Sequence, residues 1–475
     1  MKTKIVATIG PATSDFENLK ALIKEGVNVC RLNFSHDSHD YKKEIIKNIK
    51  KINSELGTNA AILADLQGPK IRTGLIKDGA IELVEGETII FSTEACEGDK
   101  NRIFISYDRF AKDVSIGERV LMDDGKLQVE VSEILSDTEV KMEIIAGGSL
   151  SSKKGVNLPD TKITTPSITE KDIEDVIFAL EHDVNWVALS FVRTAQDILE
   201  LKEIIRKNAK HYLPKIIAKI EKPEAIKNIQ EIIDVTDAIM IARGDLGVEV
   251  PQERVPLIQK NIIRQCQVHS KPVIVATQMM EGMMDNLRPT RAEVSDVAYS
   301  VMQGADAVMT SGETSVGKHP LETIATMKAI INEVEQYEDI YFKHFLPSRE
   351  SENPRFINDS ILYSACNLAQ HAEAKAIIGN THSGYSAFRI SAQRPKSPIY
   401  IFAKNKHLAE TMNLVWGVQP FCLDDFHDTD IMLQKLPAYL KGIGLVNAGD
   451  PLVFFGSAPL GLMGKTNMLH LSYCL

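Results

Sequence analysis

Residues 215–245 read KIIAKIEKPEAIKNIQEIIDVTDAIMIARGD, and this stretch carries the pattern that decides the fold. It begins and ends with short apolar runs, KIIAKIE at 215–221 and AIMIARG at 238–244, which a helical pattern joins. Runs that are apolar on both faces and are linked by helices are typical of buried parallel strands. The stretch therefore predicts one strand–helix–strand unit of an α/β fold.

The same unit recurs on both sides of this stretch. Further apolar runs, each followed by a helical pattern, are KIVATIG at 4–10, VNVCRLNF at 27–34, AILADLQ at 61–67, WVALSF at 186–191, VIVATQ at 273–278 and AVMTSG at 307–312. Eight parallel strands with crossover helices favour a (β/α)8 TIM barrel, although the spacing alone also allows a doubly wound sheet. We expect the barrel at 1–68 and 167–344.

Two other segments differ in composition. Residues 69–166 read as short alternating strands with turn signals, which predicts an all-β barrel insertion after strand 3. A loop at that position opens on the catalytic face of a barrel, so we expect a lid domain. From 345 to 475 a second α/β alternation with about five strand signals predicts a C-terminal three-layer α/β regulatory domain.

The composition limits the classes of partner. A chain of 475 residues is too long for one hydrophobic core, and its net charge of −10 argues against a broad nucleic-acid-binding face. No apolar run approaches the roughly 18 residues that a membrane span needs. The six cysteines form no CxxC pair and suit a reducing compartment. We expect a cytoplasmic protein with no nucleic-acid or membrane partner.

Polar residues gather at the carboxyl ends of most predicted barrel strands. They are Arg31, Asn33 and Ser35 after the second strand, Asp65 after the third, Lys219 and Glu221 after the fifth, Arg243, Gly244 and Asp245 after the sixth, Thr277 and Gln278 after the seventh, and Ser311, Gly312 and Glu313 after the eighth. Charged groups at buried strand ends are costly unless they are paired or bind a ligand. Because barrel enzymes carry their chemistry at this end, the pattern predicts an active site.

The residue types indicate the chemistry of this site. Glu221 and Asp245 offer hard oxygen ligands, which suit Mg²⁺ or Mn²⁺ rather than zinc. Lys219 precedes Glu221 by two residues on one strand, so both side chains point to the same face. Arg31 adds a fork that matches phosphate oxygens. A metal, a lysine and an arginine around one anion form the recurring set of groups for phosphoryl transfer.

A longer set of motifs carries a resemblance to a known family. KTKIVATIGPA, NVCRLNFSH, DLQGPKIRTG, KKGVNLP, MIARGDLGVEVP, VIVATQMMEGM, PTRAEVSDVA and SGETSVGKHP occur in this order, and the chain resembles the pyruvate kinase family over nearly its whole length. The resemblance implies transfer of the phosphoryl group of phosphoenolpyruvate to ADP, giving pyruvate and ATP in glycolysis. It also implies a homotetramer and a second metal ion that arrives with ADP.

The resemblance also implies a role for each matching residue. Arg31 and Lys219 would bind the transferring phosphoryl group, and Lys219 would be the main stabiliser of the transition state. Glu221 and Asp245 would hold the divalent metal. The remaining contacts are Gly244, Asp245 and Thr277 for the substrate carboxylate, with Thr277 near the proton that reaches the enolate carbon, and Asn33, His36 and Arg72 for the nucleotide.

Lys70 departs from the family pattern. Most similar sequences have a glutamate there and need K⁺ beside Asn33, Ser35 and Asp65. A lysine ammonium is a fixed monovalent cation and can replace K⁺ in the field at the phosphates. The substitution predicts activity that does not require K⁺; the alternative is that Lys70 is a solvated charge at the lid hinge.

The loop Thr381-His382-Ser383-Gly384-Tyr385-Ser386 resembles the phosphate loop that binds allosteric effectors in this family. Hydroxyl groups and backbone N–H groups at a helix start can hold a phosphate. We expect a sugar-phosphate or nucleotide effector, with one phosphate or two; the alternative is that the enzyme has no effector.

Two other functions compete with the kinase. A metal-dependent barrel lyase or aldolase acting on an oxo-acid also uses Mg²⁺ and barrel-end carboxylates, but the β insertion and the added arginine and lysine favour a nucleotide and a phosphoryl group. An inactive sugar-phosphate sensor would need losses among the catalytic residues. Arg31, Lys219, Glu221, Asp245 and Thr277 are all present.

Overall fold

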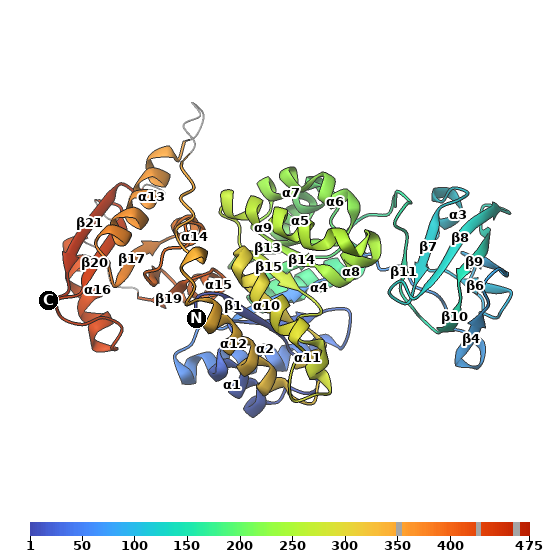
Figure 1. Ribbon diagram of the computed structural model, residues 1–475, viewed down its shortest axis with the longest axis horizontal. Coiled ribbons are helices and arrows are strands. Elements are labelled where there is room, and N and C mark those ends of the chain that lie inside the picture. The colour runs from blue at the N-terminus through green and yellow to red at the C-terminus, as the bar shows by residue number, and fades with distance from the viewer. Residues whose placement is uncertain (348–353, 424–428, 459–465) are drawn as a thin grey trace.

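The computed structural model describes residues 1–347, 354–423, 429–458 and 466–475 and has three lobes in a row (Figure 1). A barrel lies in the middle, a β-rich lobe lies at one end, and an α/β lobe that contains the C-terminus lies at the other. Within the described ranges, no helix combines the length and apolar character that crossing a membrane requires.

The central lobe is a closed barrel of eight parallel strands, as predicted. The strands are β1 (Lys4–Thr8), β2 (Val29–Asn33), β3 (Ala61–Asp65), β12 (Trp186–Leu189), β13 (Lys215–Ile220), β14 (Ala238–Ala242), β15 (Val273–Ala276) and β16 (Ala307–Thr310). β1 pairs with both β2 and β16, so the sheet closes on itself and is not doubly wound. The strands are buried on both faces, which is why their sequences read as continuous apolar runs.

Helices surround the barrel, and local capping residues mark where some of them begin. They are α1 (Phe16–Glu25), α2 (His39–Leu56), α4 (Glu170–Glu181), α5 (Ala195–Asn208), α6 (Pro223–Lys227), α7 (Ile229–Val235), α8 (Arg243–Glu249), α9 (Val255–Val268), α10 (Arg291–Gln303), α11 (Gly312–Ser315) and α12 (Pro320–Val334). The α4 helix, for example, begins with a capping box in which Thr169 and Asp172 satisfy each other's backbone N–H groups.

The segment between β3 and α4 forms the β-rich lobe. Its elements are β4 (Ala80–Leu83), β5 (Thr88–Ser92), β6 (Arg102–Phe104), α3 (Phe110–Asp113), β7 (Arg119–Met122), β8 (Leu127–Ile134), β9 (Glu139–Ala146), β10 (Gly148–Ser151) and β11 (Val156–Asn157). A six-stranded and a two-stranded sheet enclose one apolar core. The all-β insertion predicted after strand 3 is confirmed.

The C-terminal lobe has three layers, as predicted. Its elements are α13 (Phe356–His371), β17 (Ala376–Thr381), α14 (Tyr385–Ala392), β18 (Ile399–Ala403), α15 (Lys406–Met412), β19 (Val418–Cys422), α16 (Thr429–Gly442), β20 (Pro451–Gly456) and β21 (Met468–Tyr473). One apolar core lies on each face of the sheet β19-β18-β17-β20-β21. The sheet has five strands, in agreement with the about five strand signals in the sequence, and its last strand, β21, is antiparallel.

Candidate active site

Four charged side chains form one network at the carboxyl end of the barrel. Arg31 Nη2 lies 2.7 Å from Asp65 Oδ2, and Lys219 Nζ lies 3.2 Å from Asp65 Oδ1. Lys219 Nζ also lies 3.0 Å from Glu221 Oε1. The structure therefore brings together, from β2, β3 and β13, residues that are far apart along the chain.

Burial and mutual attraction decide the charge states in this network. Burial disfavours the charged form of Lys219, but the neighbouring Asp65 and Glu221 outweigh it and raise the pKa of Lys219. Burial also disfavours the ionised form of Asp65, yet the charges of Lys219 and Arg31 lower the pKa of Asp65 below its ordinary value. Lys219 and Asp65 are therefore both charged at neutral pH.

Glu221 and Asp245 are the two candidate metal ligands. Burial, and then the nearby charge of Asp245, raise the pKa of Glu221. Its Oε2 atom accepts a hydrogen bond from the Phe191 N–H at 2.8 Å, and its Oε1 atom faces Lys219. A divalent cation would relieve the repulsion between the two carboxylates. Because Mg²⁺ is commonly held by one or two carboxylates plus substrate oxygens, this donor set fits such an ion.

Thr277 and Gly244 meet across two neighbouring strand ends. The Gly244 N–H donates a hydrogen bond to Thr277 Oγ1 at 2.7 Å, and Thr277 Oγ1 donates to the Ala276 carbonyl at 2.5 Å. Thr277 has a φ of +70°, which is rare for a β-branched residue. Arg243 holds this conformation, since its Nη2 atom donates to the Thr277 carbonyl at 2.7 Å.

The β-rich lobe faces the barrel across an open cleft. The cleft measures about 580 Å³, and its wall includes Asp124 from the β-rich lobe and Gly244 and Asp245 from the barrel. Arg72 lies in the β-rich lobe, half-buried, and its backbone N–H donates to Ser106 Oγ at 2.8 Å.

The predicted monovalent-cation residues are only partly brought together. Asn33 Oδ1 accepts from the Ser35 N–H at 3.0 Å, next to the strand that carries Asp65. Lys70 is exposed and makes no ion pair with the described residues. It lines a hollow between the β-rich lobe and the barrel, whose wall also includes Asp245.

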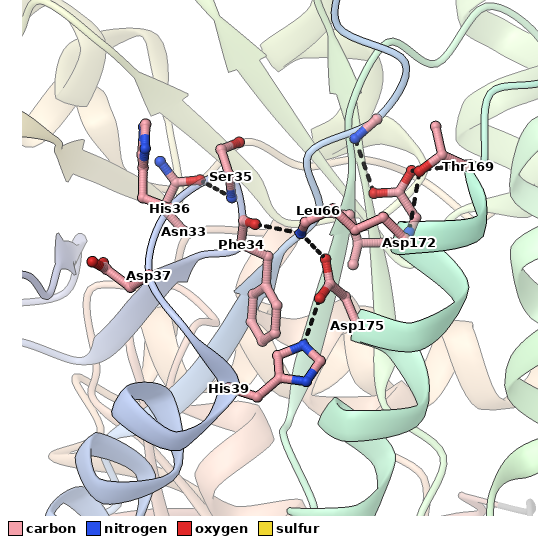
Figure 2. Close-up of polar contacts among 12 residues, drawn as sticks. Asn33, Phe34, Ser35, His36, Asp37, His39, Leu66, Thr169, Asp172 and Asp175 are labelled. Carbon is pink, nitrogen blue, oxygen red and sulfur yellow. Dashed lines mark hydrogen bonds and ion pairs between the residues drawn. The ribbon is translucent and has the colours of Figure 1, made fainter.

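His36 lies in the loop between β2 and α2, and its side chain is exposed. It lies at a separate hollow of about 370 Å³ whose wall includes Asn33 and Tyr41. In Figure 2 the side chains of Asn33 and His36 lie close together above the start of α2. The arrangement places these two predicted nucleotide contacts at the end of β2 and in the loop that follows it.

Residues of α4 that the sequence did not single out hold the site's loops in place (Figure 2). Lys171 Nζ donates to the Phe34 carbonyl at 2.7 Å and pairs with Asp175 at 2.6 Å. Asp172 is fully buried, and its Oδ1 atom accepts from the Gly68 N–H at 3.0 Å. The capping box at 169–172 is visible in the sequence, but it signals only a helix start.

The predicted effector loop lies in the C-terminal lobe, at the start of α14. Thr381 Oγ1 accepts from the Gly384 N–H at 2.9 Å and from Ser386 Oγ at 3.3 Å. Ser383 and His382 are exposed. Tyr385 points elsewhere, because its hydroxyl donates to Asp359 Oδ1 at 2.6 Å. Within the loop, the hydroxyl groups of Thr381 and Ser386 therefore lie together, whereas that of Tyr385 does not join them.

Comparisons with known proteins cover the whole chain. Residues 1–324 match the family model for the pyruvate kinase barrel domain, and residues 359–472 match the model for the pyruvate kinase alpha/beta domain. Curated pyruvate kinases from Staphylococcus haemolyticus and Staphylococcus aureus are each 42% identical over 471 residues, covering 99% of this chain and 80% of theirs. The crystal structure of a pyruvate kinase from Cryptosporidium parvum superposes with a TM-score of 0.94 at 34% identity, covering 100% of this chain and 96% of that one.

The barrel, its cationic site and these matches define a phosphotransferase. The chain belongs to the pyruvate kinase family. Membership implies phosphoenolpyruvate and ADP as substrates and a requirement for a divalent metal.

Proposed function

We propose that the chain transfers the phosphoryl group of phosphoenolpyruvate to ADP in glycolysis and that it acts in the cytoplasm. In this proposal, Arg31 and Lys219 bind the phosphoryl group during the transfer. The observation that carries the proposal is the position of Lys219, buried between Asp65 and Glu221 with Arg31 on the far side of Asp65. Because these two cations are already held in position, the protein does not need to reorganise when negative charge develops on the reacting oxygens.

The reaction breaks the bond between phosphorus and the enolate oxygen of phosphoenolpyruvate, and a β-phosphate oxygen of ADP forms the new bond. Lys219 and Arg31 stabilise the phosphoryl oxygens during this transfer. Lys219, whose pKa is raised, stays charged and does not lose a proton. The enolate left behind takes up a proton at carbon to become pyruvate.

Thr277 and the start of α8 bind the substrate's carboxylate end. Thr277 Oγ1 already accepts from the Gly244 N–H, so the two groups are held in one orientation. We assign Thr277 to the side from which the proton reaches the enolate carbon. Glu221 and Asp245 would hold Mg²⁺ or Mn²⁺, and the bound ion supplies neutralisation of negative charge on the substrate oxygens.

Asn33, His36 and Arg72 are assigned to the nucleotide, with the lid closing over it. We also propose the division into a catalytic barrel at 1–68 and 167–344, a lid at 69–166 and a regulatory domain at 345–475. Separate apolar cores in the three lobes support this division. A homotetramer and an effector bound at 381–386 rest on the family resemblance.

A coupled assay tests the reaction. Pyruvate formation from phosphoenolpyruvate with Mg²⁺ should require ADP and should produce one ATP for each pyruvate. Product that forms at the same rate without ADP would instead support the lyase. Adding glucose 6-phosphate or AMP to wild type and to Ser386→Ala tests the effector assignment in the same assay.

We further propose that Lys70 makes the enzyme independent of K⁺. Lys70 lines the hollow that also contains Phe191 and Asp245, which supports a role for its charge near the site. The assay is repeated with tetramethylammonium as the only monovalent cation, and full activity is expected. Loss of most activity under these conditions would leave Lys70 as a solvated hinge charge.

A further inference from the structure

A buried lysine lies beside the loop at 34–38, which joins β2 to α2. Lys42 is in the first turns of α2, and it is 2% exposed. The nearby carboxylate of Asp175 pairs with Lys171 and His39. Among the residues that the structure describes, no carboxylate lies within ion-pair distance of Lys42. In that part of the chain, Lys42 is therefore a buried cation without an ionic partner.

Two effects disfavour a positive charge at this place. Burial lowers the pKa of Lys42, because it removes water from the ammonium group. The start of a helix carries a partial positive charge, which favours anions rather than cations. A lysine that is kept here against both effects indicates a role other than the stability of α2.

The backbone of the loop compensates the ammonium group of Lys42. Helical side chains tilt toward the start of their helix, so Lys42 reaches back to the residues before α2. Its Nζ atom donates to the carbonyl of His36 and, at 3.1 Å, to the carbonyl of Asp37. The same atom lies 5.0 Å from the centroid of the Phe34 ring, which is a cation–π contact. The charge thus holds the backbone of two consecutive loop residues.

A second ammonium group holds the loop from another helix. Lys171 of α4 donates to the Phe34 carbonyl at 2.7 Å, and Asp175 orients it at 2.6 Å. The other carboxylate oxygen of Asp175 contacts His39, at the start of α2, at 2.7 Å (Figure 2). Three carbonyl groups of the loop therefore face the ammonium groups of two lysines that come from different helices.

The loop and the strand end before it carry residues that are assigned to the nucleotide. Asn33 and His36 line the hollow of about 370 Å³, and Lys42 belongs to its wall as well. Asp37 follows His36 with a φ of +64°, which is uncommon for a residue with a side chain and persists only when surrounding contacts hold it. The hydrogen bond from Lys42 to the Asp37 carbonyl is such a contact. Lys42 therefore holds the backbone that directs the His36 side chain.

We propose that Lys42 and Lys171 are positioning residues for ADP, because their ammonium groups keep the loop in the conformation that presents His36 to the nucleotide. The inference rests on the proposed function, from which it takes the nucleotide assignment of this loop. If the loop spends only a fraction of the time in this conformation, the apparent affinity for ADP falls by that fraction. Binding of phosphoenolpyruvate at Lys219 does not require the loop and should change little.

Two matched variants of α2 test the proposal. Lys42→Met removes the buried ammonium group, and Lys43→Met makes the same change at the next residue, which is exposed. KM values for ADP and phosphoenolpyruvate are measured in the coupled assay, and calorimetry on the full chain gives the dissociation constant of ADP with Mg²⁺. Because two hydrogen bonds from a charged donor are lost, Lys42→Met should weaken ADP binding about tenfold relative to Lys43→Met. kcat and KM for phosphoenolpyruvate should change by less than about threefold.

The pattern of the changes separates positioning from a general loss of structure. Affinities for ADP that agree within about twofold in the two variants would overturn the proposal. Equal increases in both KM values would overturn it as well, since a folding defect does not select one substrate. Calorimetry needs no turnover, so a wild type that binds ADP but forms no pyruvate would contradict the proposed function and leave the test of Lys42 intact.

Lys171 provides a second pair of variants in case Lys42→Met does not fold. The Lys171 side chain is 49% exposed, so its replacement disturbs the packing less. Lys171→Met removes the donor to the Phe34 carbonyl, whereas Lys171→Arg keeps a charged donor. We expect Lys171→Met to raise KM for ADP about fivefold and Lys171→Arg to remain within about twofold of wild type. An unchanged KM for ADP in Lys171→Met would show that the loop does not need its lysines and would refute the proposal.

Discussion

Replacing Lys219 by methionine should remove most of the turnover while leaving the metal site intact. The side chain keeps its length and apolar stem, but the ammonium within 3.0 Å of Glu221 Oε1 and 3.2 Å of Asp65 Oδ1 is lost. Asp65 retains Arg31 at 2.7 Å as its counter-charge. Glu221 loses the cation that it shares with the transferring phosphoryl group.

The size of the effect follows from the electrostatics of the site. Two unit charges about 4 Å apart interact by about 4 kcal/mol at an effective dielectric constant of about 20. Since each 1.36 kcal/mol changes a rate tenfold, losing this stabilisation in the transition state lowers kcat by about a thousandfold. KM for phosphoenolpyruvate should change much less, because Arg31 and the metal still bind the ground state.

Steady-state assays of pyruvate formation and titration of Mn²⁺ by electron paramagnetic resonance check this prediction together. Ser190→Ala is the matched control, because it removes the hydroxyl that accepts from Lys219 Nζ at 2.8 Å but keeps the charge. We expect the control to lose less than about tenfold in kcat. Turnover of Lys219→Met within tenfold of wild type, or a hundredfold loss of Mn²⁺ affinity, would refute the assigned role.

Three further predictions follow from the hinge, the metal site and the lobe contact. Lys70→Glu should create a requirement for K⁺, seen as activity that rises with added KCl but not with tetramethylammonium chloride; equal activity in both salts contradicts it. Burial raises the pKa of Glu221, and its ionised form is the proposed metal ligand, so Mn²⁺ affinity should fall as the pH is lowered below neutral; a constant affinity would argue against Glu221 as a ligand. Arg394→Met should destabilise the protein by about 3–5 kcal/mol in urea unfolding, because it leaves Asp306 buried and unpaired; a change below 1 kcal/mol would show that the pair contributes little.

The barrel could be predicted because its signal is local. Each strand lies within a continuous apolar run, and each run is bounded by a helix pattern of matching period. The spacing of Lys219 and Glu221 on one strand already placed both side chains on the same face. The antiparallel direction of the last strand, β21, was not predicted, because the direction of a strand depends on which distant strand it pairs with.

The supporting contacts could not be predicted in this way. These contacts hold the charged network or the segment that leads into the β-rich lobe, but each acts on a residue far away in the chain. They come from Ser190, the Phe191 N–H, Lys171 and Asp172. Nothing in the local sequence distinguishes them from ordinary helix caps and loop residues.

The amino-acid sequence by itself determined which segments become strands and which chemical groups stand at their ends, because burial and side-chain period act over a few neighbouring residues. Only the tertiary structure decided that Arg31, Asp65, Lys219 and Glu221 share one network, and that Lys70 stays apart from it. The physical reason is barrel closure: the register between parallel strands sets which side chains meet, and that register is a property of the whole sheet.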